Sequence, residues 1–191
     1  MTTDSSFAAY CDRSAELIRA SGQVLGGELL NGAIGAICGA LMGGKPVLVC
    51  GNGGSAADSM HLAAELMGRF KRNRGPLKVM SLATDPAFLT AWANDFEYET
   101  VFSRQVEAFG EPGAVLIAIS TSGNSKNVVR ALEQARAMKL VTVALTGEGG
   151  GAMAGLADHL FAVASKETAL IQQVHLCLYH WICDAVEQRC C

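Results

Sequence analysis

Two side chains that can move a proton or hold a metal, His61 and Glu65, lie four residues apart in a predicted helix from Ser55 to Phe70. Ser55 is the expected N-cap, with Asp58 completing a start that resembles a capping box. Residues four apart share one helix face, about 6 Å apart along the axis. As an exposed pair they would add only about 0.5 kcal/mol of helix stability.

The flank of this helix that carries His61 and Glu65 is otherwise apolar. Its other residues are Ala57, Met60, Ala64 and Met67. These neighbours indicate that the pair faces inward, where a carboxylate needs a partner. The spacing therefore favours acid–base chemistry or metal binding over a simple surface pair.

A glycine-rich turn, Gly51-Asn52-Gly53-Gly54-Ser55, precedes the helix. Glycines let the backbone approach a ligand closely, and the N–H groups and dipole of a helix start favour an anion. The turn fits the loose dinucleotide pattern, but the acid expected about 20 residues later is missing. It is not a nucleotide P-loop, because no Gly-Lys-Ser/Thr follows. An anion-binding turn and a purely structural turn both stay open.

A second polar turn, Ser120-Thr121-Ser122-Gly123-Asn124-Ser125, again joins an apolar strand to a predicted helix. Its four hydroxyl groups and the N–H groups of the helix start suit a phosphate. Ligands of open α/β sheets bind outside the carboxyl ends of the strands, so the two turns predict one shared pocket. Helix capping by Ser122 or Ser125 is the simpler alternative, and it explains one hydroxyl group better than four.

The last predicted helix, from Thr168 to Glu187, carries Gln172 and His180 on one stripe and His175 off that stripe. A histidine in an apolar helix is more often a hydrogen-bonded core residue than a ligand. If this helix packs on the helix of His61, however, the two bring together His, Glu and His, which are common zinc ligands. A bound metal would polarise a carbonyl or hydroxyl oxygen.

The elements that must position these residues alternate between apolar strands and helices. The predicted strands are Val47–Cys50, Leu77–Leu82, Val115–Ser120, Val141–Thr146 and Leu160–Ala164. The predicted helices between and after them are 55–70, 88–93, 102–109, 125–138 and 168–187. Alternation of apolar strands with helices is typical of a parallel sheet covered on both faces. The predicted fold class is α/β, a three-layer sandwich around a five-stranded parallel sheet.

The N-terminal part, from about Ser5 to Gly43, is predicted to be helical with a break at Gly26-Gly27. Gly35, Gly39 and Gly43 recur every four residues on one helix face. Each glycine costs a helix about 1 kcal/mol relative to alanine. Two explanations stay open. Either the helix tolerates the glycines, or this face makes a close helix–helix contact, for example between subunits.

The composition limits the classes of function. The 191 residues favour one domain, and 50% hydrophobic with 17% charged residues is typical of a globular protein. A net charge of -3 disfavours nucleic acid as a partner. The uncharged segment from Leu29 to Gly44 is shorter than the ~20 residues of a membrane span, so no membrane partner is expected. Seven cysteines without a CxxC pair, and a start without a signal peptide, predict reduced thiols in a cytoplasmic protein.

Six sequence blocks make the chain resemble the phosphoheptose isomerases, or sedoheptulose 7-phosphate isomerases, within the sugar isomerase (SIS) domain group. The blocks are GNGGSAAD, HLAAELMGRF, LTAWANDFEYETVFSRQVEAFG, ISTSGNSKNV, ALTGEGGGAMAGLAD and IQQVHLCLYH. Their order makes the resemblance specific over roughly residues 45–188. The first 40 residues resemble the family in helical character and length.

The resemblance implies a flavodoxin-like SIS fold, with an N-terminal helical oligomerisation segment (1–44) before the SIS domain (45–191). It implies conversion of D-sedoheptulose 7-phosphate to D-glycero-D-manno-heptose 7-phosphate through an enediol, for bacterial surface heptose biosynthesis. It also implies a homotetramer with active sites at subunit interfaces and one Zn²⁺ per subunit.

The resemblance also implies roles for particular residues. Glu65 would be the base and His180 the acid of the isomerisation, each contributing roughly 10²–10⁴-fold. The implied zinc ligands are His61, Glu65, Gln172 and His180. The implied substrate contacts are Asn52, Gly53, Gly54, Ser55, Glu65, Asn94, Asp95, Ser120, Thr121, Ser122, Ser125 and Gln172.

The chain departs from the family pattern in a few places. Gln173 stands where a glutamate often follows the motif glutamine, and Ala169 and Leu170 stand where a polar residue is common. Ala87 stands near a usual serine or threonine. The catalytic pair is unchanged. Two other functions stay open: a non-catalytic SIS-domain protein that binds a replication initiator, and an isomerase for another sugar phosphate.

Overall fold

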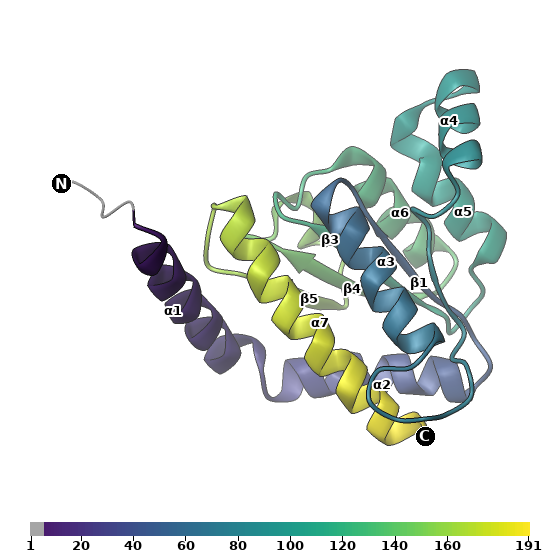
Figure 1. Ribbon diagram of the computed structural model, residues 1–191. Coiled ribbons are helices and arrows are strands. Elements are labelled where there is room, and N and C mark those ends of the chain that lie inside the picture. Colours follow the sequence, from purple (N-terminus) through teal and green to yellow (C-terminus); the bar gives the residue numbers. More distant parts are fainter. Residues whose placement is uncertain (1–5) are drawn as a thin grey trace.

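A computed structural model describes residues 6–191 (Figure 1). Its five strands form one parallel sheet in the order β2-β1-β3-β4-β5. The strands are β1 (Val47–Gly51), β2 (Val79–Ser81), β3 (Val115–Ser120), β4 (Val141–Thr146) and β5 (His159–Ala162). The chain runs outward from β1 to β2 and then returns to β3 on the other side of β1. Ligands of such sheets bind where the strand order reverses, at the carboxyl ends of the strands.

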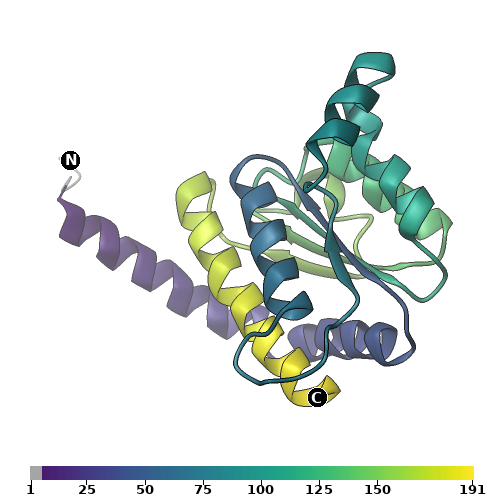
Figure 2. The same cartoon turned by 45° about the vertical axis from the view of Figure 1, so that its right-hand side comes forward.

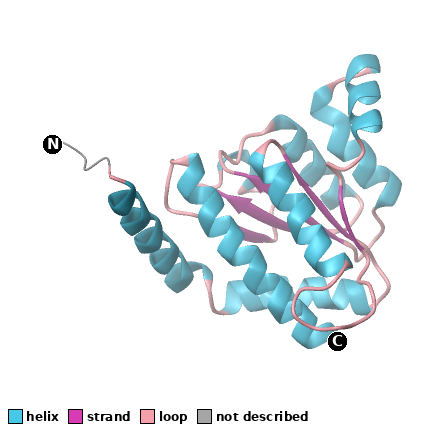
Figure 3. Ribbon diagram, in the orientation of Figure 1, coloured by secondary structure: helices cyan, strands magenta, loops and turns pink. Residues whose placement is uncertain are grey.

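Helices cover both faces of the sheet and complete three layers (Figure 3). On one face pack α2 (Glu28–Met42), α3 (Gly54–Met67) and α7 (Thr168–Cys190). On the other face pack α5 (Val101–Phe109) and α6 (Lys126–Ala137). Every residue of β1 and β3 is buried because both faces are covered. The predicted three-layer α/β sandwich with a five-stranded parallel sheet is confirmed.

The helices α3 and α7 run side by side and in the same direction on their face of the sheet (Figures 1 and 2). The His61 and Tyr179 side chains meet midway along both helices, and the Glu187 carboxylate near the end of α7 accepts the backbone N–H of Phe70, three residues after α3 ends. This pairing determines which residues of the two helices meet at the site.

The remaining helices lie toward the two ends of the molecule. The helix α1 (Phe7–Leu25) extends away from the sheet and meets α2 at an angle of 76° (Figure 2). The helix α4 (Pro86–Asp95) consists of half-buried and exposed residues. Two short 3₁₀ helices are η1 (Tyr98–Thr100) and η2 (Gly151–Met153). The predicted break at Gly26-Gly27 is confirmed, while residue 5, where the first helix was predicted to begin, lies outside the described residues.

The start of α3 differs from the prediction. The helix begins at Gly54, with Gly53 as its N-cap at a φ of +54°, and Ser55 is buried within the first turn. Asp58 faces Tyr179 instead of completing a capping box. The prediction that Ser55 caps the helix was wrong, because the positive φ of a glycine turns the chain before the serine is reached.

Other element boundaries differ by a few residues. The strand β2 spans only 79–81, and α7 continues three residues beyond Glu187 to Cys190. The helix α4 includes Asn94 and Asp95, which had been expected to follow a shorter helix. The positions of the strands in the chain are as predicted.

The glycine face of α2 makes no close contact within residues 6–191. A Cβ atom at Gly35 or Gly39 would meet no atom of the described chain within 4 Å. Gly43 is the C-cap of the helix. A contact of this face with another subunit stays a prediction, as does the division of the chain at residue 44.

Among the described residues, no single helix has both the length and the hydropathy that a membrane span requires. The helices α1 and α2 reach that length and hydropathy only together, as a strongly bent pair.

Candidate active site

The two polar turns are neighbours at the carboxyl edge of the sheet. The strands β1 and β3 pair along their whole length, with Gly51 beside Ile119. The glycine turn follows Gly51, and the serine-rich turn begins at Ser120. The two turns are therefore neighbours, and the pocket that they are predicted to share stays a prediction.

The glycine turn has no room for larger side chains at two positions. A Cβ atom at Gly51 would collide with the backbone of Ser55, and one at Gly54 would collide with the side-chain amide of Gln172. Gly53 and Gly54 are exposed, which leaves the N-terminus of α3 open. The positive end of the helix dipole can therefore receive an anion there.

The serine-rich turn gathers three hydroxyl groups. Ser120 Oγ lies 2.9 Å from Ser125 Oγ and 3.4 Å from Ser122 Oγ. Ser125 is the N-cap residue of α6, but its side chain makes no capping hydrogen bond in the part of the chain that the structure describes. Ser122 Oγ accepts a hydrogen bond from the N–H of Asn124. Capping of α6 therefore does not account for the cluster, which agrees with a phosphate site. Thr121, between the serines, is half-buried.

Asn52 joins the glycine turn to two other segments. Its side-chain amide exchanges hydrogen bonds of 2.8 and 2.9 Å with that of Asn127 in α6. The Tyr98 hydroxyl donates to Asn52 Oδ1 at 3.1 Å. Sequence reasoning missed Asn127 and Tyr98, and the one local signal was a polar residue on the buried face of α6.

Asn94 and Asp95, the residues expected to bind sugar hydroxyls, lie in the exposed last turn of α4. Asn94 Nδ2 donates to Asp95 Oδ1 at 2.9 Å. The chain continues from them to Tyr98, which contacts the glycine turn through Asn52. Their contact with a substrate stays a prediction.

The helices α3 and α7 bring together His61, Glu65 and His180. One nitrogen or oxygen atom of each side chain lies within 4.8 Å of those of the other two. His61 Nε2 is 3.0 Å from Glu65 Oε1, and the rings of His61 and His180 meet edge to face at 5.0 Å. The side chains of His61 and Glu65 are 45% and 24% exposed. Contrary to the prediction, the pair therefore faces the surface of the chain and not its interior.

The second ring nitrogen of His61 also has a partner. His61 Nδ1 lies 3.0 Å from the buried hydroxyl of Tyr179, which also lies 3.4 Å from Asp58 Oδ1. Burial, and then the charge of Asp58, raise the pKa of the Tyr179 hydroxyl. Burial raises the pKa of Asp58, while Tyr179 and His61 oppose this shift. These contacts fix the orientation of the His61 ring.

His180 contacts three rings. Phe70 stacks on it at 5.6 Å with an interplanar angle of 23°, and His61 and Tyr179 meet it edge to face at 5.0 and 4.9 Å. Burial, and then the charge of His61, lower the pKa of His180, with Glu65 opposing. A lower pKa favours the neutral imidazole, which is the form that binds a metal or accepts a proton.

The cluster of His61, Glu65 and His180 fits a divalent metal by its chemistry. Two imidazoles and a carboxylate are a common zinc ligand set, and their donor atoms converge. Metal-binding histidines usually have a hydrogen-bond partner on the other ring nitrogen, as His61 has in Tyr179.

Two other residues of α7 lie apart from this cluster. Gln172 lies against Gly54, about 12 Å of helix rise before His180, and its role as a metal ligand stays a prediction. His175 is buried, and its Nε2–H donates to the Thr146 carbonyl at 3.1 Å. His175 is therefore a hydrogen-bonded core residue.

Comparison with known proteins relates this arrangement to a family. The SIS domain model matches residues 9–147. A phosphoheptose isomerase from Crocosphaera subtropica is 49% identical over 160 residues, which are 84% of this chain and 82% of that protein. The chain is a member of the phosphoheptose isomerase family. A second phosphoheptose isomerase, from Akkermansia muciniphila, is 52% identical over 78% of this chain and 79% of its own length.

Solved structures of phosphoheptose isomerases share the fold. The protein GmhA from Neisseria gonorrhoeae is 39% identical, with a TM-score of 0.89 over 95% of this chain and 96% of that one. The phosphoheptose isomerase from Francisella tularensis is 32% identical, with a TM-score of 0.92 over 98% of this chain and 100% of its own. The chain thus has the SIS fold of its family over nearly its whole length, including most of the N-terminal helices.

Proposed function

We propose that this isomerase interconverts D-sedoheptulose 7-phosphate and D-glycero-D-manno-heptose 7-phosphate, in the synthesis of heptose for bacterial surface polysaccharide. The observation that carries the proposal is the meeting of Glu65 and His180 from two helices, α3 and α7, the first of which begins at the glycine turn. Relatives named phosphoheptose isomerase, 49% to 52% identical to the chain, support the choice of substrate.

Glu65 and His180 have complementary roles in this reaction. The Glu65 carboxylate removes a proton from C1 of the ketose, and the C–H electrons form the C1–C2 double bond while the C2 oxygen is protonated. The enediol then loses the proton of its C1 oxygen and gains one at C2, which gives the aldose. His180 moves the protons between the two oxygens. Each group contributes roughly 10²–10⁴-fold.

The two turns and the end of α4 hold the substrate in this proposal. The hydroxyl cluster around Ser120, with the open N-terminus of α6, receives the phosphate. Residues 52–55 lie against the reacting end of the sugar, and Asn94 and Asp95 bind its hydroxyls. A sugar held at both ends reacts faster because the acid and the base are already oriented.

The proposed metal is zinc, one ion per subunit, held by His61, Glu65 and His180. Gln172 lies about 12 Å of helix rise from His180 in the same chain, so it can be the fourth ligand only from a neighbouring subunit. When bound, the ion would polarise a carbonyl or hydroxyl oxygen of the substrate. Glu65 has two oxygens, so it can coordinate through one and accept the proton on the other. The convergence of the three donor groups supports this assignment.

The proposed assembly is a homotetramer with active sites at subunit interfaces. Trp181, directly after His180, is 58% exposed, and Met60 beside His61 is 41% exposed. An apolar cavity of about 410 Å³ lies between α1, α2 and α7 and is lined by Leu25, Leu30 and Trp181. Large exposed apolar side chains on the helices that carry the site support coverage by another copy of the chain. The proposed location is the cytoplasm, which agrees with seven cysteines free of disulfides.

The test is to incubate the full chain with sedoheptulose 7-phosphate and follow the sugar by ¹³C NMR. We expect an aldose product, and we expect its formation to slow when a chelator removes zinc. Fructose 6-phosphate serves as a comparison substrate, and faster turnover of it would favour an isomerase for another sugar phosphate. Folded, zinc-loaded protein that forms no aldose from either sugar would refute the proposal.

The chain retains both groups of the proposed catalytic pair, which a non-catalytic SIS-domain protein would not need. Glu65 and His180 are both present and face each other, and the similar proteins are named as isomerases. A binding protein for a replication initiator is therefore not favoured.

A further inference from the structure

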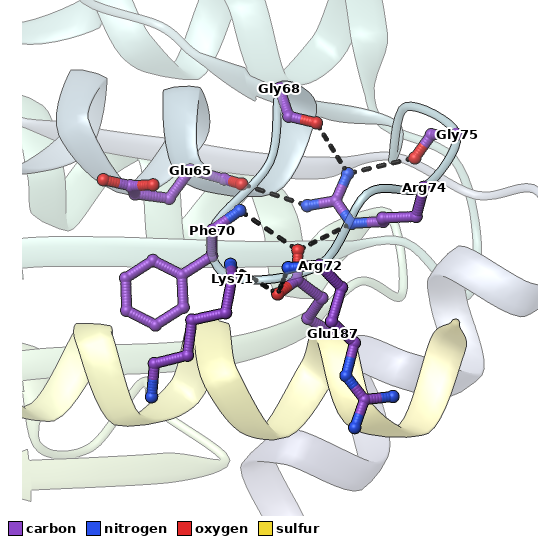
Figure 4. A network of polar contacts seen from close by, with 8 residues as sticks. All are labelled: Glu65, Gly68, Phe70, Lys71, Arg72, Arg74, Gly75 and Glu187. Carbon is purple, nitrogen blue, oxygen red and sulfur yellow. Dashed lines mark hydrogen bonds and ion pairs between the residues drawn. The ribbon is translucent and has the colours of Figure 1, made fainter.

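A buried ion pair lies where the loop after α3 crosses α7 (Figure 4). Arg74 Nε donates to Glu187 Oε1 at 3.1 Å, and the two side chains are 4% and 1% exposed. Removing two charges from water costs about as much as their attraction returns, so a buried pair is weak evidence for stability alone. We therefore consider which other groups Arg74 and Glu187 bind.

The guanidinium of Arg74 binds the end of the helix that carries the proposed base. Its Nη2 donates to the backbone carbonyl of Glu65 at 3.0 Å, and its Nη1 donates to the carbonyls of Gly68 and Gly75 at 3.0 Å each. The last carbonyls of a helix have no partner within the helix, and the helix dipole favours a cation there. Arg74 thus holds the last turn of α3, where Glu65 lies, in helical geometry.

The carboxylate of Glu187 holds the residue that covers the proposed acid. Glu187 lies on α7 seven residues, or about two turns, after His180. It accepts the backbone N–H groups of Phe70 at 3.0 Å, Lys71 at 2.7 Å and Arg72 at 2.8 Å. Phe70 in turn stacks its ring on His180. Burial works against the charged form, but these donors and Arg74 keep the pKa of Glu187 below its ordinary value.

One ion pair therefore reaches both members of the proposed catalytic pair. It reaches Glu65 through the backbone carbonyl of that residue, and it reaches His180 through the ring of Phe70. The same loop makes a second contact with α7, which is exposed: Lys71 Nζ pairs with Asp184 at 2.7 Å, and the Lys71 side chain is 60% exposed. The Lys71 ammonium also lies 5.3 Å from the centre of the Phe70 ring, but the Asp184 carboxylate holds neither Phe70 nor the end of α3. The two contacts provide a matched comparison within one loop.

We propose that Arg74 and Glu187 are positioning residues that set the distance between the Glu65 carboxylate and the His180 imidazole. The proposal rests on the proposed function, which makes those two groups the base and the acid. Without the ion pair, the last turn of α3 and the Phe70 ring lose their anchor on α7. A displacement of about 1 Å between acid and base can cost roughly 100-fold in rate.

The test removes both charges together, with the double variant Arg74→Met/Glu187→Met in the full chain. Replacing a buried pair by apolar residues of similar size is often neutral for stability, whereas removing one partner leaves an unpaired buried charge. We expect the double variant to fold, with kcat for sedoheptulose 7-phosphate lowered roughly 10–100-fold and KM within about twofold of wild type. Arg74→Gln/Glu187→Gln, which also removes both charges but keeps polar side chains, is the second variant if the first does not fold.

The control is Asp184→Asn, which removes the exposed contact of the same loop and should keep kcat within about twofold of wild type. An independent readout is the NMR shift of the His180 ring protons, which the Phe70 ring moves upfield in wild type and less in either double variant. A folded variant with wild-type kcat and unchanged His180 shifts would overturn the proposal. If wild-type protein turns over no sugar phosphate, the proposed function fails, and the His180 shifts alone decide on positioning.

Discussion

Both ring nitrogens of His61 have a partner, one inside the cluster with Glu65 and His180 and one behind it. Nε2 faces Glu65, and Nδ1 faces the Tyr179 hydroxyl, which leads on to Asp58. A hydrogen bond at one nitrogen decides which nitrogen is free to bind a metal. Tyr179 is fully buried, so it can hold the ring in place without being displaced by water.

Tyr179→Phe removes this hydroxyl and keeps the buried ring. We expect the affinity for zinc to fall roughly 10–100-fold, the usual loss when the partner behind a metal-binding histidine is removed. Competition with a chromophoric chelator measures the affinity. Tyr98→Phe, which loses a contact to Asn52 instead, should bind zinc as wild type does. Equal affinities of Tyr179→Phe and wild type would exclude a role of Tyr179 at the metal site.

Ser125→Ala removes one hydroxyl of the cluster around Ser120 and no capping bond of α6. We expect KM for the sugar phosphate to rise about tenfold, which corresponds to one lost hydrogen bond of about 1.4 kcal/mol. Two measurements report this effect: kcat/KM for the sugar phosphate, and the affinity of inorganic phosphate as a competitive inhibitor. Both should fall by the same factor. An unchanged KM would mean that the cluster does not bind the phosphate.

At the scale of elements, the parallel packing of α3 on α7 creates the site, and α7 is itself anchored on the sheet. His175 faces the sheet, where its Nε2–H donates to the carbonyl of Thr146. Its Nδ1 has no hydrogen-bond partner among the described residues. Burial lowers the pKa of His175 to about 4, from an ordinary value of 6.5. The folded chain therefore keeps this histidine neutral at pH values where the unfolded chain protonates it.

The expected consequence is a loss of stability in acid. As the pH falls from 6.5 to about 4, the unfolded state binds a proton that the folded state does not, which lowers the free energy of unfolding by roughly 3 kcal/mol. His175→Leu should lack this part of the loss, and the Thr146 carbonyl would still accept the N–H of Val163. Urea unfolding at pH 7 and pH 4.5 measures the difference. Equal acid sensitivity of both proteins would contradict the expectation.

The sequence predicts the strands well and the long-range side-chain pairs poorly. Apolar runs bounded by glycines locate β1 and β3, because a covered parallel strand is apolar throughout. The pairing of His61 and Glu65 with His180 was conditional on two helices meeting, which no local pattern shows. Arg74 with Glu187, and Asn52 with Asn127, lie 113 and 75 residues apart and have no signal in the sequence. The start of α3 was misplaced because a serine is a common cap and Gly53 took that position.

At the scale of the whole molecule, large apolar side chains are exposed on the helices around the sheet. Trp181 on α7 is exposed, and α1 extends away from the sheet (Figure 1). Although α1 contacts α7, its Phe7 and Val24 side chains are exposed, and they gain stability when they pack on another copy. This arrangement agrees with the proposed homotetramer.

Light scattering tests the assembly. We expect wild-type protein to have a mass close to four chains of 20.0 kDa. Trp181→Glu should give a smaller species, because a carboxylate in an apolar interface is costly to bury. The exposed position in the single chain means that the fold itself should tolerate the change, which circular dichroism checks. A monomeric wild-type protein would contradict the proposed assembly.

The central claim is that Glu65 on α3 takes the proton whose transfer, with His180 on α7, turns the ketose into the aldose. Its most direct test is the reaction of sedoheptulose 7-phosphate in D₂O, with wild type and Glu65→Gln compared by NMR. We predict aldose with deuterium at C2 from wild type, and a rate lowered by at least about 100-fold for folded Glu65→Gln. Deuterated aldose formed by Glu65→Gln at the wild-type rate would contradict the account.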